Sequence, residues 1–243
     1  MSKWKIGIIA VLLFSFAYVS YSTFASEKGR SYYEKKGYIL WDIKTDEKVI
    51  ALTFDDGPHS TFTPRVLDLL AEYDAKATFF VFGQYAKKFP EIILRTDAEG
   101  HEIANHTYTH PYSSSPEELE HELKQTDDVL YDITGIYPAL YRPVGGSYTD
   151  GTINTAVENG FKVVMWSWHQ DTEDWKRPGV DQIVSKVLKG AKPGDIVLFH
   201  DAGGDRSQTV KALEEILPAL KKEGYEFVTV SDLLNRNGIQ VSR

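Results

Sequence analysis

Two histidines spaced four residues apart and a pair of adjacent aspartates are the side chains with the clearest capacity for chemistry. His106 and His110 can face one metal ion from a helical turn or a tight loop. That spacing alone is weak evidence, because the chain has 7 histidines and a chance pair arises easily. Asp55 and Asp56 add two carboxylates, so one can bind a metal while the other accepts a proton. Two histidines and a carboxylate form a catalytic zinc set with an open position for water. The alternative is an acidic turn before the following Gly-Pro, which does not explain two acids after an apolar strand.

The elements that must position these side chains alternate between short apolar segments and amphipathic segments. This alternation predicts parallel strands joined by helices. Right-handed crossovers then allow an open doubly wound sheet or a closed barrel. A Gly-x-Gly-x-x-Gly turn after the first strand is absent, so we favour an α/β fold with an irregular (β/α)7-type barrel in a single domain. The seven expected strands are residues 49–54, 77–82, 102–105, 139–142, 162–168, 195–200 and 225–230.

Ionisable residues end or follow five of these strands at the same end of the sheet. In a barrel of this kind the chemistry lies at the carboxyl ends of the strands. Chance would scatter such residues to both ends, so their clustering is the main evidence from the residues themselves for a site. In chain order the groups are Asp55-Asp56, His106 with His110, Arg142, Asp174, and His200.

Composition limits the classes of function. The chain has 243 residues, of which 42% are hydrophobic and 26% charged, so a folded core is expected. The net charge of −8 gives no electrostatic reason to bind nucleic acid. Because there is no cysteine, any metal must be held by histidines and carboxylates.

The N-terminus reads as an export segment. Lys3 and Lys5 precede a stretch without charge that extends to Ser26 and is mostly apolar. We expect residues 1–25 to be a signal peptide cut after Ala25 or an uncut signal-anchor helix. Both readings place the rest of the chain outside the cytoplasm, extracellular or at the cell surface, with membrane contact only through this segment. Residues 26–45 read as a linker and residues 46–240 as the domain.

Five ordered motifs, TFDDGP, HTYTH, RP, DTEDW and LFH, resemble those of the carbohydrate esterase family 4 polysaccharide deacetylases, also called NodB-homology domains. The resemblance covers roughly residues 46–235. It implies an irregular (β/α) barrel and a metal-dependent hydrolase that removes N-acetyl groups from N-acetylglucosamine units of a polysaccharide, peptidoglycan or chitin-like. It also implies one divalent metal ion, with zinc expected and cobalt as the alternative.

The resemblance implies a role for each matching residue. Asp55 would be the general base and His200 the general acid. Arg142 would orient Asp55, and Asp174 would hold and tune His200. The remaining implied roles are metal binding by Asp56, His106 and His110, an oxyanion contact by the backbone N–H of Gly145, and lining of the acetyl-methyl groove by Trp175 and Leu198.

The third motif departs from the family pattern of Arg-Pro-Pro-Tyr-Gly. Gly145 stands where the family has tyrosine, which retains the backbone N–H but loses an aromatic surface. Tyr148 is the candidate replacement for that surface. The departure affects the expected rate and the shape of the groove more than the reaction type. In the family that this chain resembles, deacetylases that act on N-acetylmuramic acid often replace the second aspartate. Asp56 is kept here, so the resemblance favours N-acetylglucosamine as the substrate unit.

Two other functions remain open. One is an esterase that removes O-acetyl groups from a polysaccharide with the same machinery. The other is an inactive module that only binds wall glycan, and the altered third motif is the one feature in its favour. In all three cases the partner is a polysaccharide, and we expect a monomer.

Overall fold

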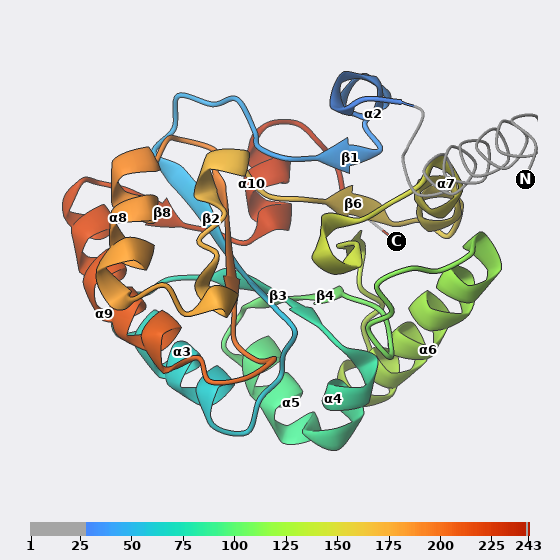
Figure 1. Cartoon of the computed structure of the whole chain (residues 1–243), viewed down its shortest axis with the longest axis horizontal. Helices are drawn as coiled ribbons and strands as arrows, with labels where there is room; N and C mark the ends of the chain where they lie inside the picture. The colour runs from blue at the N-terminus through green and yellow to red at the C-terminus, as the bar shows by residue number, and fades with distance from the viewer. Residues whose placement is uncertain (1–27, 242) are drawn as a thin grey trace, which may run out of the picture.

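The computed structural model describes residues 28–241 and 243, so the expected signal or anchor segment lies outside the described residues. A parallel sheet curves into a half-barrel, and helices surround its outer face (Figure 1). The strand order is β1-β6-β5-β4-β3-β2-β7, with β8 paired to β2. The strands are β1 (Ile39–Leu40), β2 (Val49–Asp55), β3 (Ala77–Val81), β4 (Glu102–Asn105), β5 (Leu140–Tyr141), β6 (Lys162–Val164), β7 (Ile196–His200) and β8 (Glu226–Phe227).

The helices follow the strands as the alternating pattern predicts. An example of the local signals is the helix α6, which begins with a capping box at Ser115 and ends at Gly135 in the left-handed conformation. The helices among the described residues are α2 (Arg30–Lys36), α3 (Phe62–Glu72), α4 (Gly83–Lys88), α5 (Pro90–Ala98), α6 (Pro116–Thr134), α7 (Asp150–Glu158), α8 (Val180–Gly190), α9 (Ser207–Lys222) and α10 (Val230–Arg236). None of them is long and apolar enough to cross a bilayer.

Strand β2 places the carboxylate of Asp55 at the carboxyl end of the barrel. All seven of its residues are buried, and successive side chains point to opposite faces. Ile50, Leu52 and Phe54 belong to the apolar cluster that includes the outer helices α3 and α9. Val49 and Ala51 belong to the cluster that includes Phe80, Val164 and residues of α10. Thr53 and Asp55 continue this second face toward the carboxyl end.

The curved sheet is joined across its gap by the chain that follows β6. The N–H of Ser167 donates to the carbonyl oxygen of Ile196 at 2.9 Å, and Asp171 forms an isolated parallel bridge with Leu198. The irregular (β/α)7-type barrel is thereby confirmed, with shorter strands than expected at β5, β6 and β8.

The segment expected as a linker needs correction. Within residues 26–45 lie α2 and β1, and β1 pairs with β6. Tyr33 and Trp41 are 1% and 2% exposed. Strand β1 has two residues and is therefore too short to produce an alternating pattern. The lysines of this segment make it look polar in sequence, although its aromatic residues Tyr33 and Trp41 are buried. This segment is part of the domain.

Candidate active site

Arg142 and Asp55 form a buried pair at the carboxyl ends of β5 and β2. Arg142 Nη1 donates to Asp55 Oδ1 at 2.6 Å and to Thr53 Oγ1 at 2.9 Å. Arg142 Nε and Nη2 donate to the carbonyl oxygens of Val164 and Met165. Arg142 is 0% exposed, and these four hydrogen bonds fix the orientation of its guanidinium. One oxygen of Asp55 is thus held by an ion pair, while Oδ2 lies 3.8 Å from His106 Nε2.

Asp56, His106 and His110 come together as one set of three ligands. One atom of each lies within 4.8 Å of the others. Asp56 Oδ1 is 3.7 Å from His106 Nε2 and 3.3 Å from His110 Nε2. Ligand atoms at ~2.1 Å from a tetrahedral zinc lie roughly 3.4 Å apart, so the spacing fits a divalent metal.

The electrostatics of the set also suit a cation. His106 Nδ1 donates to the carbonyl oxygen of Arg142 at 2.8 Å, which leaves the Nε2 lone pair facing Asp56. Burial lowers the pKa of His106 below its ordinary value. Burial acts to raise the pKa of Asp56, but the hydrogen bond with His110 and the charges of His106 and His200 lower it below its ordinary value.

The two loops that carry the three ligands are held in unusual backbone conformations. Asp56 after β2, and Thr107 and His110 after β4, have φ of 76°, 71° and 63°, a region that residues with a side chain rarely adopt. Asn105 Oδ1 accepts the N–H of Thr107 at 2.8 Å, and Glu122 on α6 accepts two further N–H groups of the loop. Sequence reasoning did not predict a role for Asn105 or Glu122. Glu122 could not be singled out, because an acidic residue on a helix after the HTYTH motif gives no distinct signal.

His200 is paired with Asp174 on the other side of the cavity. His200 Nδ1 lies 2.7 Å from Asp174 Oδ1, and Asp174 Oδ2 accepts the N–H of His200 and the hydroxyl of Thr209. Burial acts to lower the pKa of His200, but the hydrogen bond and charge of Asp174, with the charges of Asp55 and Asp56, raise it to about 9. The imidazole is therefore protonated near neutral pH.

These groups line one open cavity of about 410 Å³. Gly145, Trp175 and Leu198 line it too, as do Trp166 and Asp171. Tyr112, Gly203 and Arg206 also line it, and sequence reasoning missed these three. Trp175 is half exposed, whereas Leu198 is buried. Every residue expected at the site lines the cavity except Arg142 and Asp174, which lie behind Asp55 and His200. The catalytic and metal-binding roles themselves stay predictions.

The aromatic surface beside Gly145 comes from Tyr112. Gly145 lies in a short 3-10 turn with φ of 58°, and a Cβ placed on it would lie 3.9 Å from the Tyr112 ring. The same ring packs edge-on against His110, with centroids 5.2 Å apart. Tyr148, the expected replacement, packs against Tyr33 and does not line this cavity.

Asp201 is a further buried carboxyl that sequence reasoning did not single out. It is 0% exposed, and it accepts a hydrogen bond from the hydroxyl of Thr63. Its Oδ1 has no hydrogen-bond partner among the described residues. Burial raises the pKa of Asp201 to about 7.

Comparisons with known proteins assign the family. The sequence model of the polysaccharide deacetylase family matches residues 42–164. A peptidoglycan-N-acetylglucosamine deacetylase of Bacillus cereus is 52% identical over 203 residues, which are 83% of this chain and 95% of that protein. A solved peptidoglycan N-acetylglucosamine deacetylase, in complex with 4-naphthalen-1-yl-N-oxidanyl-benzamide, has a TM-score of 0.83 at 36% identity and covers 89% of this chain and 100% of its own.

A family 4 acetyl xylan esterase from Clostridium thermocellum, in complex with a cobalt ion, has a TM-score of 0.74 at 34% identity over 79% of this chain and 93% of its own. The family model covers half of the sequence, and a relative with more than 30% identity spans most of it. The motifs, the curved parallel sheet and the comparisons agree, so the chain belongs to the polysaccharide deacetylase family.

Proposed function

We propose that this protein is a metal-dependent deacetylase that hydrolyses the acetamido groups of N-acetylglucosamine units in cell-wall glycan or a chitin-like polymer. The observation that carries the proposal is the arrangement within one cavity. A carboxylate with one free oxygen, Asp55, and a protonated imidazole, His200, line it together with a His-His-Asp metal set. Amide hydrolysis needs one group that accepts a proton from water and one that donates a proton to the amine.

Asp56, His106 and His110 would hold the metal, which we propose is zinc, with cobalt as the alternative. The donor set of two imidazoles and one carboxylate is typical of catalytic zinc and leaves a coordination position open. When bound, such a cation supplies Lewis-acid chemistry that polarises the amide carbonyl and lowers the pKa of water toward ~7.

Asp55 is suited to act as the general base. Arg142 holds Oδ1 at 2.6 Å, so the carboxylate cannot rotate freely and Oδ2 is presented to the cavity beside His106. Asp55 would take the proton of the attacking water, and the N–H of Gly145 would donate to the oxyanion that forms at the carbonyl.

His200 is suited to act as the general acid. A sugar amine is too basic to leave as an anion, so it must be protonated as the bond to the acetyl carbon breaks. With a pKa raised to about 9, His200 carries the required proton at neutral pH. Leu198 and Trp175, which line the same cavity, would contact the acetyl methyl group and the sugar.

Acetate release is the test of this assignment. The full-length chain, loaded with zinc or cobalt, is given N-acetylglucosamine oligomers, peptidoglycan and acetylated xylan, with Asp55→Ala and an EDTA-treated sample as controls. Release from the N-acetyl substrates that both controls abolish supports the deacetylase. Release from acetylated xylan alone supports the O-acetyl esterase, the candidate that the likeness to an acetyl xylan esterase favours. Metal binding without any turnover supports the inactive glycan-binding module.

We further propose that the protein acts as a monomer outside the cytoplasm or at the cell surface, where a wall glycan is accessible. Residues 1–25 would direct export or anchor the chain. Mass analysis of the exported protein separates the two: a mature N-terminus at Ser26 supports cleavage, and an intact Met1 in the membrane fraction supports an anchor. Size-exclusion chromatography with light scattering checks the monomer.

A further inference from the structure

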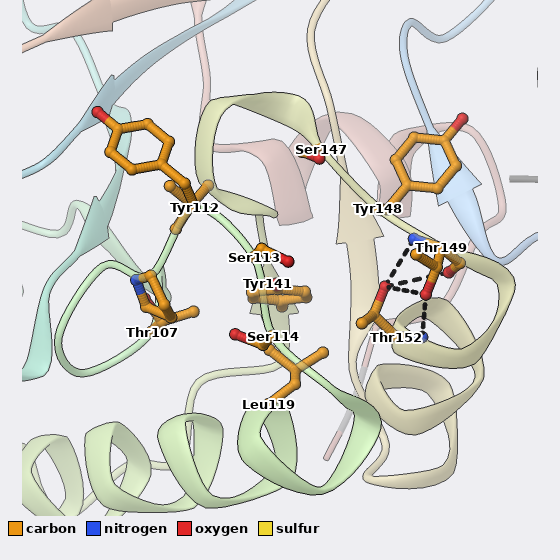
Figure 2. A pocket seen from close by; sticks show the side chains of 12 residues that line it. Thr107, Tyr112, Ser113, Ser114, Leu119, Tyr141, Ser147, Tyr148, Thr149 and Thr152 are labelled. Carbon is orange, nitrogen blue, oxygen red and sulfur yellow. Dashed lines mark hydrogen bonds between the residues drawn. The ribbon is translucent and has the colours of Figure 1, made fainter. Parts of the chain in front are cut away.

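A second, smaller pocket lies next to the candidate active site, and we call it the side pocket. It is lined by residues that include Tyr112, Ser114, Leu119, Tyr141, Val144 and Ser147. Tyr112 lines both cavities, and Val144 directly precedes Gly145 of the active-site cavity. Figure 2 shows Tyr112 and Tyr148 on opposite sides of the side pocket, with Tyr141 drawn between them. A group bound here therefore neighbours whatever occupies the active site.

The lining of the side pocket combines an apolar surface with hydroxyl groups. Leu119, Tyr141 and Val144 are at most 4% exposed and provide the apolar part. The hydroxyls of Ser114, Ser147 and Tyr141 have no hydrogen-bond partner among residues 28–241 and 243. None of the lining residues is charged. This chemistry suits a neutral group with a short apolar end and both a donor and an acceptor.

The volume of the side pocket limits which chemical groups it can bind. Its volume is about 40 Å³. A bound water needs ~10–15 Å³, so there is room for roughly three water-sized atoms or groups and none for a whole sugar ring. An acetamido group has four non-hydrogen atoms, a methyl end, an N–H donor and a carbonyl acceptor. It matches the pocket in size, polarity and absence of charge.

We propose that the side pocket binds the acetamido group of a sugar unit adjacent to the one that is deacetylated. The inference rests on the proposed deacetylase function and adds a requirement to it. The enzyme distinguishes a unit whose neighbour is N-acetylated from one whose neighbour is not. Deacetylation then slows as neighbouring units lose their acetyl groups, and the product retains some acetylated units.

The test compares two trisaccharides with N-acetylglucosamine in the middle. In one, both flanking units are N-acetylglucosamine, and in the other both are glucose, which removes the acetamido groups without adding charge. We expect kcat/KM for acetate release by the zinc-loaded full-length chain to be at least tenfold higher for the first. The number of acetylated units alone accounts for at most a factor of about three, so a difference of threefold or less overturns the inference while leaving the proposed function intact.

Variants that fill the side pocket test whether this pocket causes the preference for the trisaccharide with acetylated flanking units. Ser114→Leu and Ser147→Leu, from two sides of the pocket, should each lower kcat/KM on the acetylated trisaccharide toward the value for the glucose analogue. Ser185→Leu on α8 is the matched control, because Ser185 lies outside both cavities, and it should keep the full preference. An unchanged preference in both filling variants contradicts the assignment of the pocket.

A binding measurement separates failure of the inference from failure of the proposed function. Titration calorimetry of the two trisaccharides with the Asp55→Ala variant needs no turnover. Tighter binding of the acetylated trisaccharide that Ser114→Leu removes supports the side pocket even if the wild-type chain releases no acetate. Equal affinities overturn it, whatever the wild-type activity.

Discussion

Removal of the charge on Asp174 should shift the pH range in which the protein works. Asp174 Oδ1 lies 2.7 Å from His200 Nδ1, and the pair raises the pKa of His200 from 6.5 to about 9 against the effect of burial. Asn at position 174 keeps the shape but removes the charge, so the pKa of His200 should fall to ~6.5 or below, a loss of roughly 3 kcal/mol of preference for the protonated imidazole. At pH 7.5 the protonated fraction then drops from roughly 97% to roughly 9%, about tenfold.

The assay is the pH profile of kcat/KM for acetate release from an N-acetylglucosamine oligomer by zinc-loaded wild type and Asp174→Asn. Because the general acid works when protonated, the descending alkaline side of the profile should move to lower pH by about 2.5 units, and activity should recover as the pH falls toward ~6. A bound metal lowers the pKa of His200 in both proteins, so the difference between them is the quantity to read. Asp195→Asn removes a buried carboxylate from another His–Asp pair, His169–Asp195, and should leave the alkaline side unchanged. A loss of activity that is the same at every pH would refute the assignment of His200 as a proton donor tuned by Asp174.

Three further predictions follow from the same geometry. Treatment with EDTA should abolish acetate release, and one equivalent of zinc or cobalt should restore it, as measured by activity and metal analysis of the same samples; activity that survives with no metal bound would contradict this. Arg142→Met should leave Asp55 as an unpaired buried charge and lower the free energy of unfolding by ~3–5 kcal/mol in urea denaturation, with loss of activity; a change below about 1 kcal/mol would show that Asp55 does not depend on the pair. Because the folded pKa of Asp201 is raised from 3.8 to about 7, its contribution to stability is present below about pH 4 and lost as the pH rises through about 7. Metal-free Asp201→Asn should therefore gain stability relative to the wild type between about pH 5 and pH 8, and a constant difference across this range would contradict the raised pKa.

Much of the barrel and the site follows from periodicities that a sequence carries. The continuous apolar run of β2 and the amphipathic helices predict a parallel sheet, and a parallel sheet brings the ends of its strands to one edge. That is why Asp55, His106 and His200 meet although they are far apart along the chain. The resemblance of the ordered motifs to those of the family adds two expected pairs, Arg142 with Asp55 and Asp174 with His200.

The parts that were missed depend on single contacts and not on a pattern. Tyr112 is an exposed residue in a loop, and only the fold shows that its ring lies against Gly145. Glu122 looks like any acidic residue on a solvated helix, yet it accepts two N–H groups of the histidine loop. Strand β1 is two residues long, so its pairing with β6 leaves no periodic trace.

A zinc titration of metal-free wild type and Asp55→Asn, with acetate release from an N-acetylglucosamine oligomer and bound zinc measured together, tests whether Asp55 and the metal set act together. We expect both proteins to bind about one zinc, because Asp56, His106 and His110 are present in both. Acetate release should rise with bound zinc in the wild type and stay at least ~100-fold lower in Asp55→Asn, since a general base contributes that much or more. Equal activity in the two proteins at full zinc occupancy would show that Asp55 and the metal set do not act together on the acetamido group.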